Sequence, residues 1–407
     1  MTSASSPHLR PRDGTSQPTT PVELLFDLVY AFAVTQISHL LIDDITPTGN
    51  LTLTGTVHAV FLLFVVWWAW IYTTWMVNWF DPVSSRVRLV VVVAALASLL
   101  MAAAIPTAFT ANPVLFAGAY VTLQIGRNVS AAALLDRDHA LRPVLDRITA
   151  WSLASGALWL AGAFVAPSLR LVLWAPALAI ELVAPLVGYR TPGRGASTTM
   201  DYPVDGGHFA ERFQSFLIIV LGESIIVTGA TASARGLTAS TVVGLGLAFV
   251  ITGALWWLYF GTVAEHSREL LASAADPAQL ARDAYSYIHL PIVTGVIMVA
   301  VGDDLLLAGP GRALSWSGVA MLAGGPALFL AGEVLFRVRM TGSISPKRVI
   351  ACVLLCLLAV LLRPLPALVV AGAVSLLLTG LAVWEYDALA LPPMPVKLRR
   401  QPEELAG

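Results

Sequence analysis

Apolar residues are grouped along this chain into runs of about 20, separated by short segments rich in arginine. An α-helix rises 1.5 Å per residue, so such a run crosses the roughly 30 Å hydrocarbon core of a bilayer. The pattern therefore predicts an all-α polytopic membrane protein with about twelve transmembrane helices. The runs lie near residues 22–42, 54–77, 88–109, 113–135, 148–166, 170–189, 208–230, 238–262, 283–301, 314–336, 348–363 and 365–386.

The basic residues of the connecting segments favour one orientation. With a cytoplasmic N-terminus, 19 of the 24 lysines and arginines fall on the cytoplasmic side and four on the outer side, while Arg127 lies within a span. This excess is the positive-inside pattern. We therefore expect both termini to be cytoplasmic.

The spans divide into two sets of six, which suggests a duplication. Glu23 opens the first span, and Glu211 opens the seventh, 188 residues later. The triplet Trp-Ile-Tyr at 70–72 is similar to Trp-Leu-Tyr at 257–259. Because six is even, the two halves would share one orientation. The expected organisation is a disordered cytoplasmic tail, a first half, a cytoplasmic linker, a second half and a second cytoplasmic tail: 1–20, 21–189, 190–207, 208–386 and 387–407.

Composition agrees with a membrane protein and excludes other classes. The chain is 57% hydrophobic and 12% charged, with a mean hydropathy of +0.77, which is outside the usual range for soluble domains. Its net charge of −1 carries no basic signature of nucleic-acid binding. The sequence has no Walker-type phosphate-binding loop, and we predict no cofactor. The expected surroundings are the lipid bilayer, with a proton, ion or small molecule as ligand.

Ionisable residues inside the spans are the main functional signal. Glu23 and Asp27 are four residues apart, so a helix places them on one face. A charge in hydrocarbon costs several kcal/mol, so such acids face a protein interior or a polar path. Counting residues from the span ends places one group in the cytoplasmic half: Glu23, Asp27, Arg127, Glu181, His208, Glu211 and His289, with Tyr285 and Tyr287 beside them.

Two interpretations of this inner group stay open. We expect Arg127 to pair with Asp27 or Glu181, because a lone buried charge is costly. The group is then either an ion-pair network that holds the helices together, or a relay or substrate site in which carboxylates and histidines titrate near neutral pH.

Glu223 lies apart from that group. It is 12 residues beyond Glu211, or about 18 Å along the same helix, and Gln36 and His39 reach a comparable depth. No basic residue inside a span lies at that level. We therefore expect Glu223 to be protonated or to bind a cation rather than to form a salt bridge.

Two weaker patterns complete the candidates. His208 and Glu211, with acids of the first span, are ligand types for a transition metal, but no HExxH pair accompanies them and we predict no metal site. The aromatic stripe of the second span is more typical of helix packing than of a ligand-binding wall. It consists of Trp68, Tyr72, Trp75 and Trp79.

Four segments together resemble a known family. They are Glu-Leu-Leu-Phe-Asp-Leu-Val-Tyr-Ala-Phe-Ala at 23–33, His-Phe-Ala-Glu-Arg-Phe at 208–213, Leu-Gly-Glu-Ser-Ile at 221–225 and Tyr-Ile-His-Leu-Pro at 287–291. The chain resembles the bacterial low temperature requirement protein A family from about Pro21 to about Tyr386. That resemblance implies a multi-pass protein of the bacterial plasma membrane and implies no particular reaction.

The leading functional hypothesis is a transporter or permease-like protein with a polar path lined by buried acids. A channel is the nearest alternative. An intramembrane enzyme with a His/carboxylate site, or a non-catalytic scaffold or sensor, are the alternatives from other classes.

The topology is open to direct test. Cysteines introduced singly at the four positions assigned to the outside should react with an impermeant reagent in intact cells: Asp44, Pro167, Arg235 and Gly311. Labelling at Gly193 or Ser345 instead would reverse the assignment.

Overall fold

The computed structural model describes residues 7–11, 18–261 and 263–389, and the described part of the chain is built from helices. The first group of helices is α1 (Pro21–Thr48), α2 (Leu53–Trp79), α3 (Ser85–Ala104), η1 (Ile105–Thr107), α4 (Pro113–Ala133), α5 (Arg142–Ala163) and α6 (Pro167–Val183). The second group is η2 (Thr199–Asp201), α7 (Gly206–Arg235), α8 (Ala239–Phe260), α9 (Ala264–Ala272), α10 (Pro277–Leu280), η3 (Ala281–Ile288), α11 (Leu290–Ala308), α12 (Trp316–Leu322), α13 (Gly324–Thr341), α14 (Pro346–Leu361) and α15 (Ala367–Leu389).

The expectation of an all-α membrane protein is confirmed, whereas the count of twelve crossings is not settled. Each predicted span coincides with one helix or with two consecutive helical segments. Seven spans in the described residues are long and apolar enough to cross a membrane, and an eighth is reached if α12 and α13, bent by 44°, form one span. Helices α6 and α14 have only 17 and 16 residues, about 24–26 Å, which is short for a full crossing.

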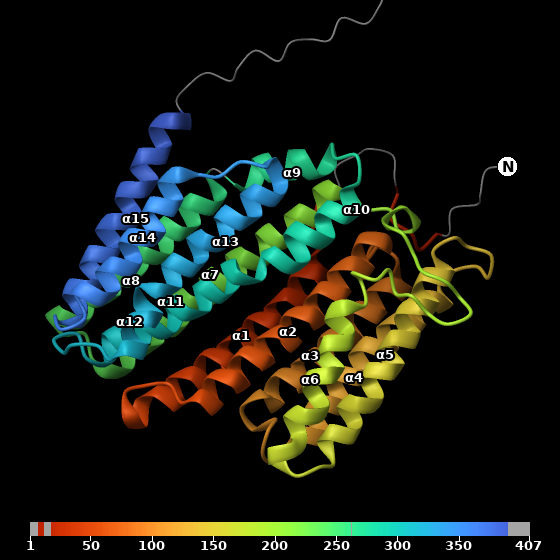
Figure 1. Ribbon diagram of the computed structural model, residues 1–407, viewed down its shortest axis with the longest axis horizontal. Coiled ribbons are helices and arrows are strands. Elements are labelled where there is room, and N and C mark those ends of the chain that lie inside the picture. The colour runs from red at the N-terminus through yellow and green to blue at the C-terminus, as the bar shows by residue number, and fades with distance from the viewer. Residues whose placement is uncertain (1–6, 12–17, 262, 390–407) are drawn as a thin grey trace, which may run out of the picture.

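The helices form two groups that lie side by side (Figure 1). One contains α1 to α6, and the other contains α7 to α15. Helix α1 touches both α7 and α11, and α2 touches α7. The interface between the groups is therefore built mainly on α1, α2, α7 and α11.

Small residues bring helices of the second group close together. A Cβ atom on Gly295 of α11 would lie 2.7 Å from the carbonyl oxygen of Gly325 in α13. Because lipid supplies little hydrophobic drive between helices, such close backbone packing is a main source of their association. Arg348 of α14 adds polar contacts, at 2.7 Å to Glu333 of α13 and 2.8 Å to Glu385 of α15.

The segment before α1 packs against the end of α2. The backbone N–H of Arg10 donates to the carbonyl of Trp79 at 2.9 Å, and that of Asp81 donates to His8 at 2.9 Å. The predicted disordered tail is therefore wrong for residues 7–11, which pair with the α2–α3 turn. Residues 18–20 are also described, and Thr19 and Thr20 form hydrogen bonds. Residues 1–6 and 12–17 lie outside the described residues, as do residues 390–407 of the predicted C-terminal tail.

Candidate functional site

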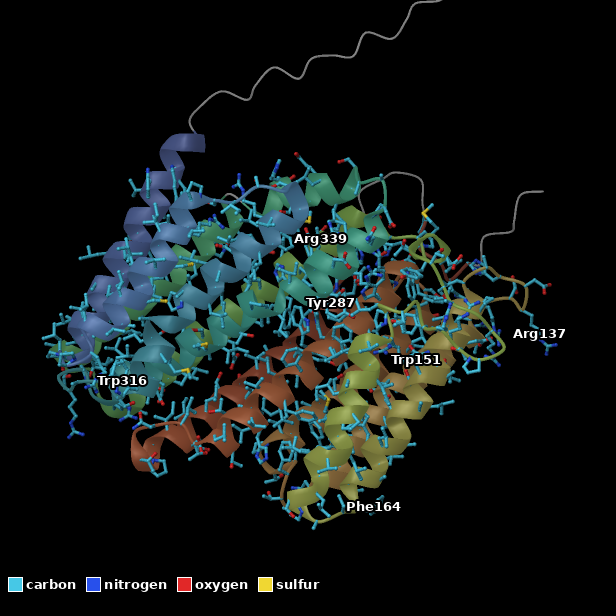
Figure 2. The ribbon with its side chains drawn as sticks, viewed as in Figure 1. Arg137, Trp151, Phe164, Tyr287, Trp316 and Arg339 are labelled. Carbon is cyan, nitrogen blue, oxygen red and sulfur yellow. The ribbon has the colours of Figure 1, made fainter. Side chains whose placement is uncertain are left out.

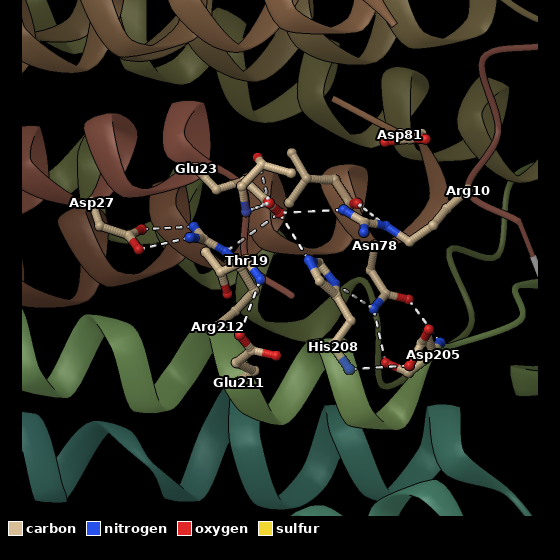
Figure 3. A network of polar contacts seen from close by, with 12 residues as sticks. Arg10, Thr19, Glu23, Asp27, Asn78, Asp81, Asp205, His208, Glu211 and Arg212 are labelled. Atoms are coloured by element: carbon tan, nitrogen blue, oxygen red, sulfur yellow. Dashed lines mark hydrogen bonds and ion pairs between the residues drawn. The ribbon is translucent and has the colours of Figure 1, made fainter. Parts of the chain in front are cut away.

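A buried ion pair joins α1 to α7 (Figure 3). Both terminal nitrogens of Arg212 donate to Asp27, at 2.6 and 2.7 Å. The indole N–H of Trp70, on α2, donates to the same carboxylate at 2.8 Å. Both charged residues are at most 1% exposed. A two-pronged, fully buried pair of this kind is a strong form of charge-assisted hydrogen bonding.

One turn earlier on each helix, Glu23 and His208 form a second contact. Oε2 of Glu23 accepts hydrogen bonds from the backbone N–H and the hydroxyl of Thr20, both at 2.7 Å. This capping box fixes the carboxylate at the start of α1. Its other oxygen, Oε1, lies 2.9 Å from Nε2 of His208 and 3.5 Å from Arg10. Glu23 thus caps its own helix and binds α7 at the same time.

The tautomer of His208 follows from its neighbours. Oδ1 of Asn78 accepts the backbone N–H of Asp205 at 3.0 Å, so the amide nitrogen of Asn78 is the atom that faces Nδ1 of His208, at 3.2 Å. An amide nitrogen only donates, and Nδ1 must therefore accept. His208 is then a neutral imidazole that donates through Nε2 to Glu23.

The charges of this network balance. Its two carboxylates, Glu23 and Asp27, face two guanidinium groups, Arg10 and Arg212, around a neutral His208. Burial lowers the pKa of Arg10, and the attraction of nearby carboxylates, Glu23 foremost, opposes that shift. We call this set the α1–α7 network. Its arrangement is that of the first interpretation above, an ion-pair network that holds helices together.

The sequence placed Glu211 correctly near this network but gave Arg127 the wrong partner. The carboxylate of Glu211, half-buried, accepts the backbone N–H of Thr19 at 3.0 Å. Arg127 instead donates to the side chains of Thr73 at 3.1 Å and Gln124 at 2.6 Å. No carboxylate of the described residues forms an ion pair with it. The expected pairing is wrong because residue counting does not give the direction in which α4 faces.

Glu181 belongs to a separate polar chain within the first group of helices. It accepts hydrogen bonds from the hydroxyl of Tyr120 and, at 3.0 Å, from the indole of Trp159. Gln124 donates to Tyr120 at 2.9 Å and accepts from Arg127. The expected contact between Arg127 and Glu181 is thus indirect, through two neutral side chains.

His289 is also separate from the α1–α7 network. Its ring lies in an aromatic cage, parallel to Tyr285 at 5.8 Å and edge-on to Phe213 and Phe336 at 5.2 Å. Nε2 is 3.2 Å from the hydroxyl of Tyr259. Tyr287 points elsewhere, and its hydroxyl donates to the carbonyl of Leu182 at 2.6 Å. The predicted convergence of these residues with the acids of α1 is therefore wrong.

Glu223 lies between α1, α7 and α11. It accepts a hydrogen bond from the hydroxyl of Thr35, and no ion pair to it occurs among the described residues. A cavity of about 10 Å³ beside it is lined by residues of all three helices, including Ser38 and Ala300, and has room for about one water molecule. Gln36 is half-buried and His39 is exposed, and the contact of Glu223 to α1 is made by Thr35 instead.

Sequence reasoning missed several buried charges. Arg212 was counted among the cytoplasmic loop residues, although its spacing of four from His208 matches the spacing of Glu23 and Asp27. Asp303 and Asp304 stand together in the apolar run of α11. Asp304 accepts from Thr231 at 2.8 Å, and neither carboxylate oxygen of buried Asp303 has a hydrogen-bond partner in the described part of the chain. Two adjacent acids in an apolar run were the available signal.

The described residues contain no group of three or more His, Cys, Asp or Glu side chains that is placed to hold a metal ion. Of the acids considered with His208 as metal ligands, Glu23 contacts it at 2.9 Å, while His289 lies in its aromatic cage.

The comparisons with known proteins extend over nearly the whole chain. The family model of the bacterial low temperature requirement A protein (LtrA) matches residues 18–383. The chain belongs to the LtrA family. It is also similar to an uncharacterized protein of Rhizobium meliloti (strain 1021), with 36% identity over 369 residues, covering 90% of this chain and 88% of the relative. No solved structure matches it. Family and apolar helices together identify an LtrA membrane protein.

For this LtrA chain, breaking the Asp27–Arg212 pair should be costly. Asp27→Asn or Arg212→Gln leaves a buried charge without its partner, so each should lower the free energy of unfolding by about 3–5 kcal/mol. The double variant should lose less than the sum of the two. Equilibrium unfolding of the detergent-solubilised protein measures all three values.

Glu265→Gln is the matched control. Glu265 pairs with Arg268 at 2.6 Å, but their side chains are 63% and 35% exposed, so its loss should cost about 1 kcal/mol or less. Additive effects of Asp27→Asn and Arg212→Gln would show that the two side chains are not coupled.

Proposed function

We propose that this protein is a carrier that moves a proton, an ion or a small solute across the bacterial plasma membrane, with Glu223 as its titrating or cation-binding acid. The chain would cross the membrane twelve times, in two six-helix halves of the same orientation, with both termini in the cytoplasm. The observation that supports a carrier best is the setting of Glu223. It is a half-buried acid of α7, beside a cavity, with a hydroxyl rather than a guanidinium as its partner.

Polar groups continue from Glu223 along the interface of α7 with α11. Ser224 is buried, and its hydroxyl has no hydrogen-bond partner among the described residues. Thr231, eight residues or about 12 Å beyond Glu223, donates to Asp304 of α11. In the other direction, Arg212 of the α1–α7 network is 11 residues, or about 16 Å, away. Ionisable groups thus recur along α7 and the neighbouring part of α11, at intervals of about 12–16 Å.

The two sets of acids are suited to different tasks. Asp27 is held by Arg212 and Trp70 at close range, so protonating it would break a buried pair. Glu223 has no such pair to break. An acid without an ion-pair partner can take up and release a transported cation without breaking a buried pair, which suits a coupling role. We therefore assign the α1–α7 network to assembly and Glu223 to coupling.

Contacts between α1 and α7 also support the proposed duplication. Glu23 contacts His208 near the start of α7, and Glu211 contacts Thr19 just before the start of α1. Thr35 and Glu223 are 188 residues apart, the same offset as Glu23 and Glu211, and they bond to each other. Equivalent positions that touch each other are expected on a two-fold axis. Residues further along α1 contact residues further along α7, so the two helices run in the same direction.

Glu223→Gln tests the assignment. The amide keeps the shape of the side chain and most of its hydrogen bonding but does not titrate. In proteoliposomes, the wild type should show pH-dependent flux of the transported species, and the variant should fold normally and lose that dependence. Fluorescent reporters of internal pH and of internal cation concentration provide the measurement.

Glu269→Gln is the matched control, because Glu269 is an exposed acid on α9. It should leave the flux and its pH dependence unchanged. If Glu223→Gln transports with the pH dependence of the wild type, Glu223 is a structural residue. If the wild type moves neither protons, cations nor solutes, the carrier assignment itself fails.

A further inference from the structure

A second cavity lies on another face of α2, away from the Asp27 contact of Trp70. It is lined by aromatic side chains from α2, from the segment between α6 and α7, and from η3, together with Asn128 of α4 and apolar side chains of α5. We call it the aromatic pocket, and its defining residues are Trp75, Trp79, Tyr189, Tyr202, Arg282 and Tyr287. Tyr287 lies at the boundary between the two groups of helices (Figure 2). The stripe that sequence analysis attributed to packing thus also forms one wall of a cavity.

One residue that lines this pocket, Trp79, has a hydrogen-bond donor without an acceptor. The indole N–H of Trp79 is buried and has no hydrogen-bond partner within the described residues. The other four tryptophans of α2 all donate: Trp67 and Trp75 to Ser286, Trp68 to Glu181 and Trp70 to Asp27. A buried donor without a partner costs about 1–3 kcal/mol. A ligand that supplies an acceptor would recover that energy.

The charge at the pocket is positive. Arg282 lines it, and no carboxylate does. Nε of Arg282 donates to Asp283 at 2.8 Å, but Arg339 also donates to Asp283, at 2.7 Å. One carboxylate is therefore shared by two guanidinium groups, so it neutralises Arg282 only in part. Asp201 and Asp276 act on Tyr202 from nearby, but neither lines the pocket. Burial raises the pKa of Tyr202, so its phenol stays neutral beside Arg282.

The size of the pocket limits its ligand. The cavity measures about 40 Å³ and adjoins a wider hollow of about 580 Å³, and Tyr202 and Arg282 line both. Since a water needs about 10–15 Å³ measured in this way, the inner space suits a group of about three heavy atoms. An apolar group would fill it, with the polar end of the ligand at Arg282.

The wall opposite α2 is held in a costly backbone conformation. Tyr189 has φ = 51°, in the left-handed region that non-glycine residues avoid. Gly188 precedes it with φ = 60°, and a Cβ there would lie 2.1 Å from the carbonyl oxygen of Ser197. The hydroxyl of Tyr189 donates to that of Tyr72 at 3.3 Å. Such strain persists where the surrounding structure fixes it, often around ligands.

We propose that the aromatic pocket binds a small organic carboxylate, with its short apolar group among the aromatic rings and its carboxylate between the indole N–H of Trp79 and the guanidinium of Arg282. This site does not depend on the role given to Glu223. The alternative ligand, an organic cation held by the aromatic faces, would meet Arg282 at the same place and be repelled.

Three probes of one shape separate charge from size: isobutyrate, neutral isobutyramide and cationic isobutyramidinium. Isothermal titration calorimetry on the full chain in detergent measures their affinities, and the thermal unfolding temperature gives an independent readout. Isobutyrate should bind saturably and raise the unfolding temperature. The amide should bind at least about tenfold more weakly, since hydrogen bonds to a charged group are worth about 1.5–3 kcal/mol, and the amidinium should not bind.

Two variants assign the contacts. Arg282→Gln should weaken the binding of isobutyrate by about tenfold or more and leave the affinity for the amide nearly unchanged. Trp79→Phe keeps an aromatic ring but removes the N–H, so it should weaken the binding of both probes by several-fold. Arg268→Gln, at a partly exposed arginine of α9, is the control and should change the affinity for neither probe. Glu223→Gln should bind isobutyrate as tightly as the wild type does.

The proposal is overturned if the amidinium binds as well as isobutyrate, or if none of the three probes binds saturably. Unchanged affinity of Arg282→Gln for isobutyrate would also overturn it. The probe series is measured on the wild type, so the first two of these outcomes do not depend on how well the variants fold. If the wild type binds isobutyrate as expected but shows no transport in proteoliposomes, the carrier assignment is refuted and the proposal for this site stands.

Discussion

The need to leave no charge unpaired in a low-dielectric interior governs the junction between the two groups of helices. Asp27 and Arg212 neutralise each other through two hydrogen bonds of 2.6 and 2.7 Å. One turn away, the carboxylate of Glu23 is paired with His208 and Arg10. Each pair alone must offset a large desolvation cost, and their combination fixes how α1 is rotated and how deep it lies against α7. The positions of Thr35 and Glu223, further along the same two helices, follow from that registration.

Much of the fold could be predicted from the sequence because hydrophobic length is a strong signal in membrane proteins. The helices lie where the apolar runs placed them, and Glu23, Asp27 and His208 were correctly brought together. Residue counting gives the depth of a side chain but not the direction in which its helix faces. That is why Arg127 was expected to pair with Asp27 or Glu181, although it faces Thr73 and Gln124.

Other features were outside the reach of local patterns. Arg212 was counted with the cytoplasmic basic residues because it stands in the first two turns of α7, and charges near span ends are used to set orientation. The contact of residues 7–11 with the end of α2 depends on a tertiary pairing that the composition of a Ser- and Pro-rich segment does not predict. The aromatic pocket depends on the segment between α6 and α7, where Tyr189 takes a backbone conformation that no sequence rule predicts for tyrosine.

The 185 residues between Asp27 and Arg212 have a consequence for biosynthesis. Helix α1 leaves the ribosome long before α7 exists, so its two acids enter the membrane without the partners that later neutralise them. The cost of an isolated charge at that stage favours an α1 that stays protonated or in contact with the insertion machinery until α7 arrives. The same pairing then distinguishes complete chains from truncated ones. A chain cut off after α6 would keep its acids unpaired, and quality-control proteases can recognise such a chain.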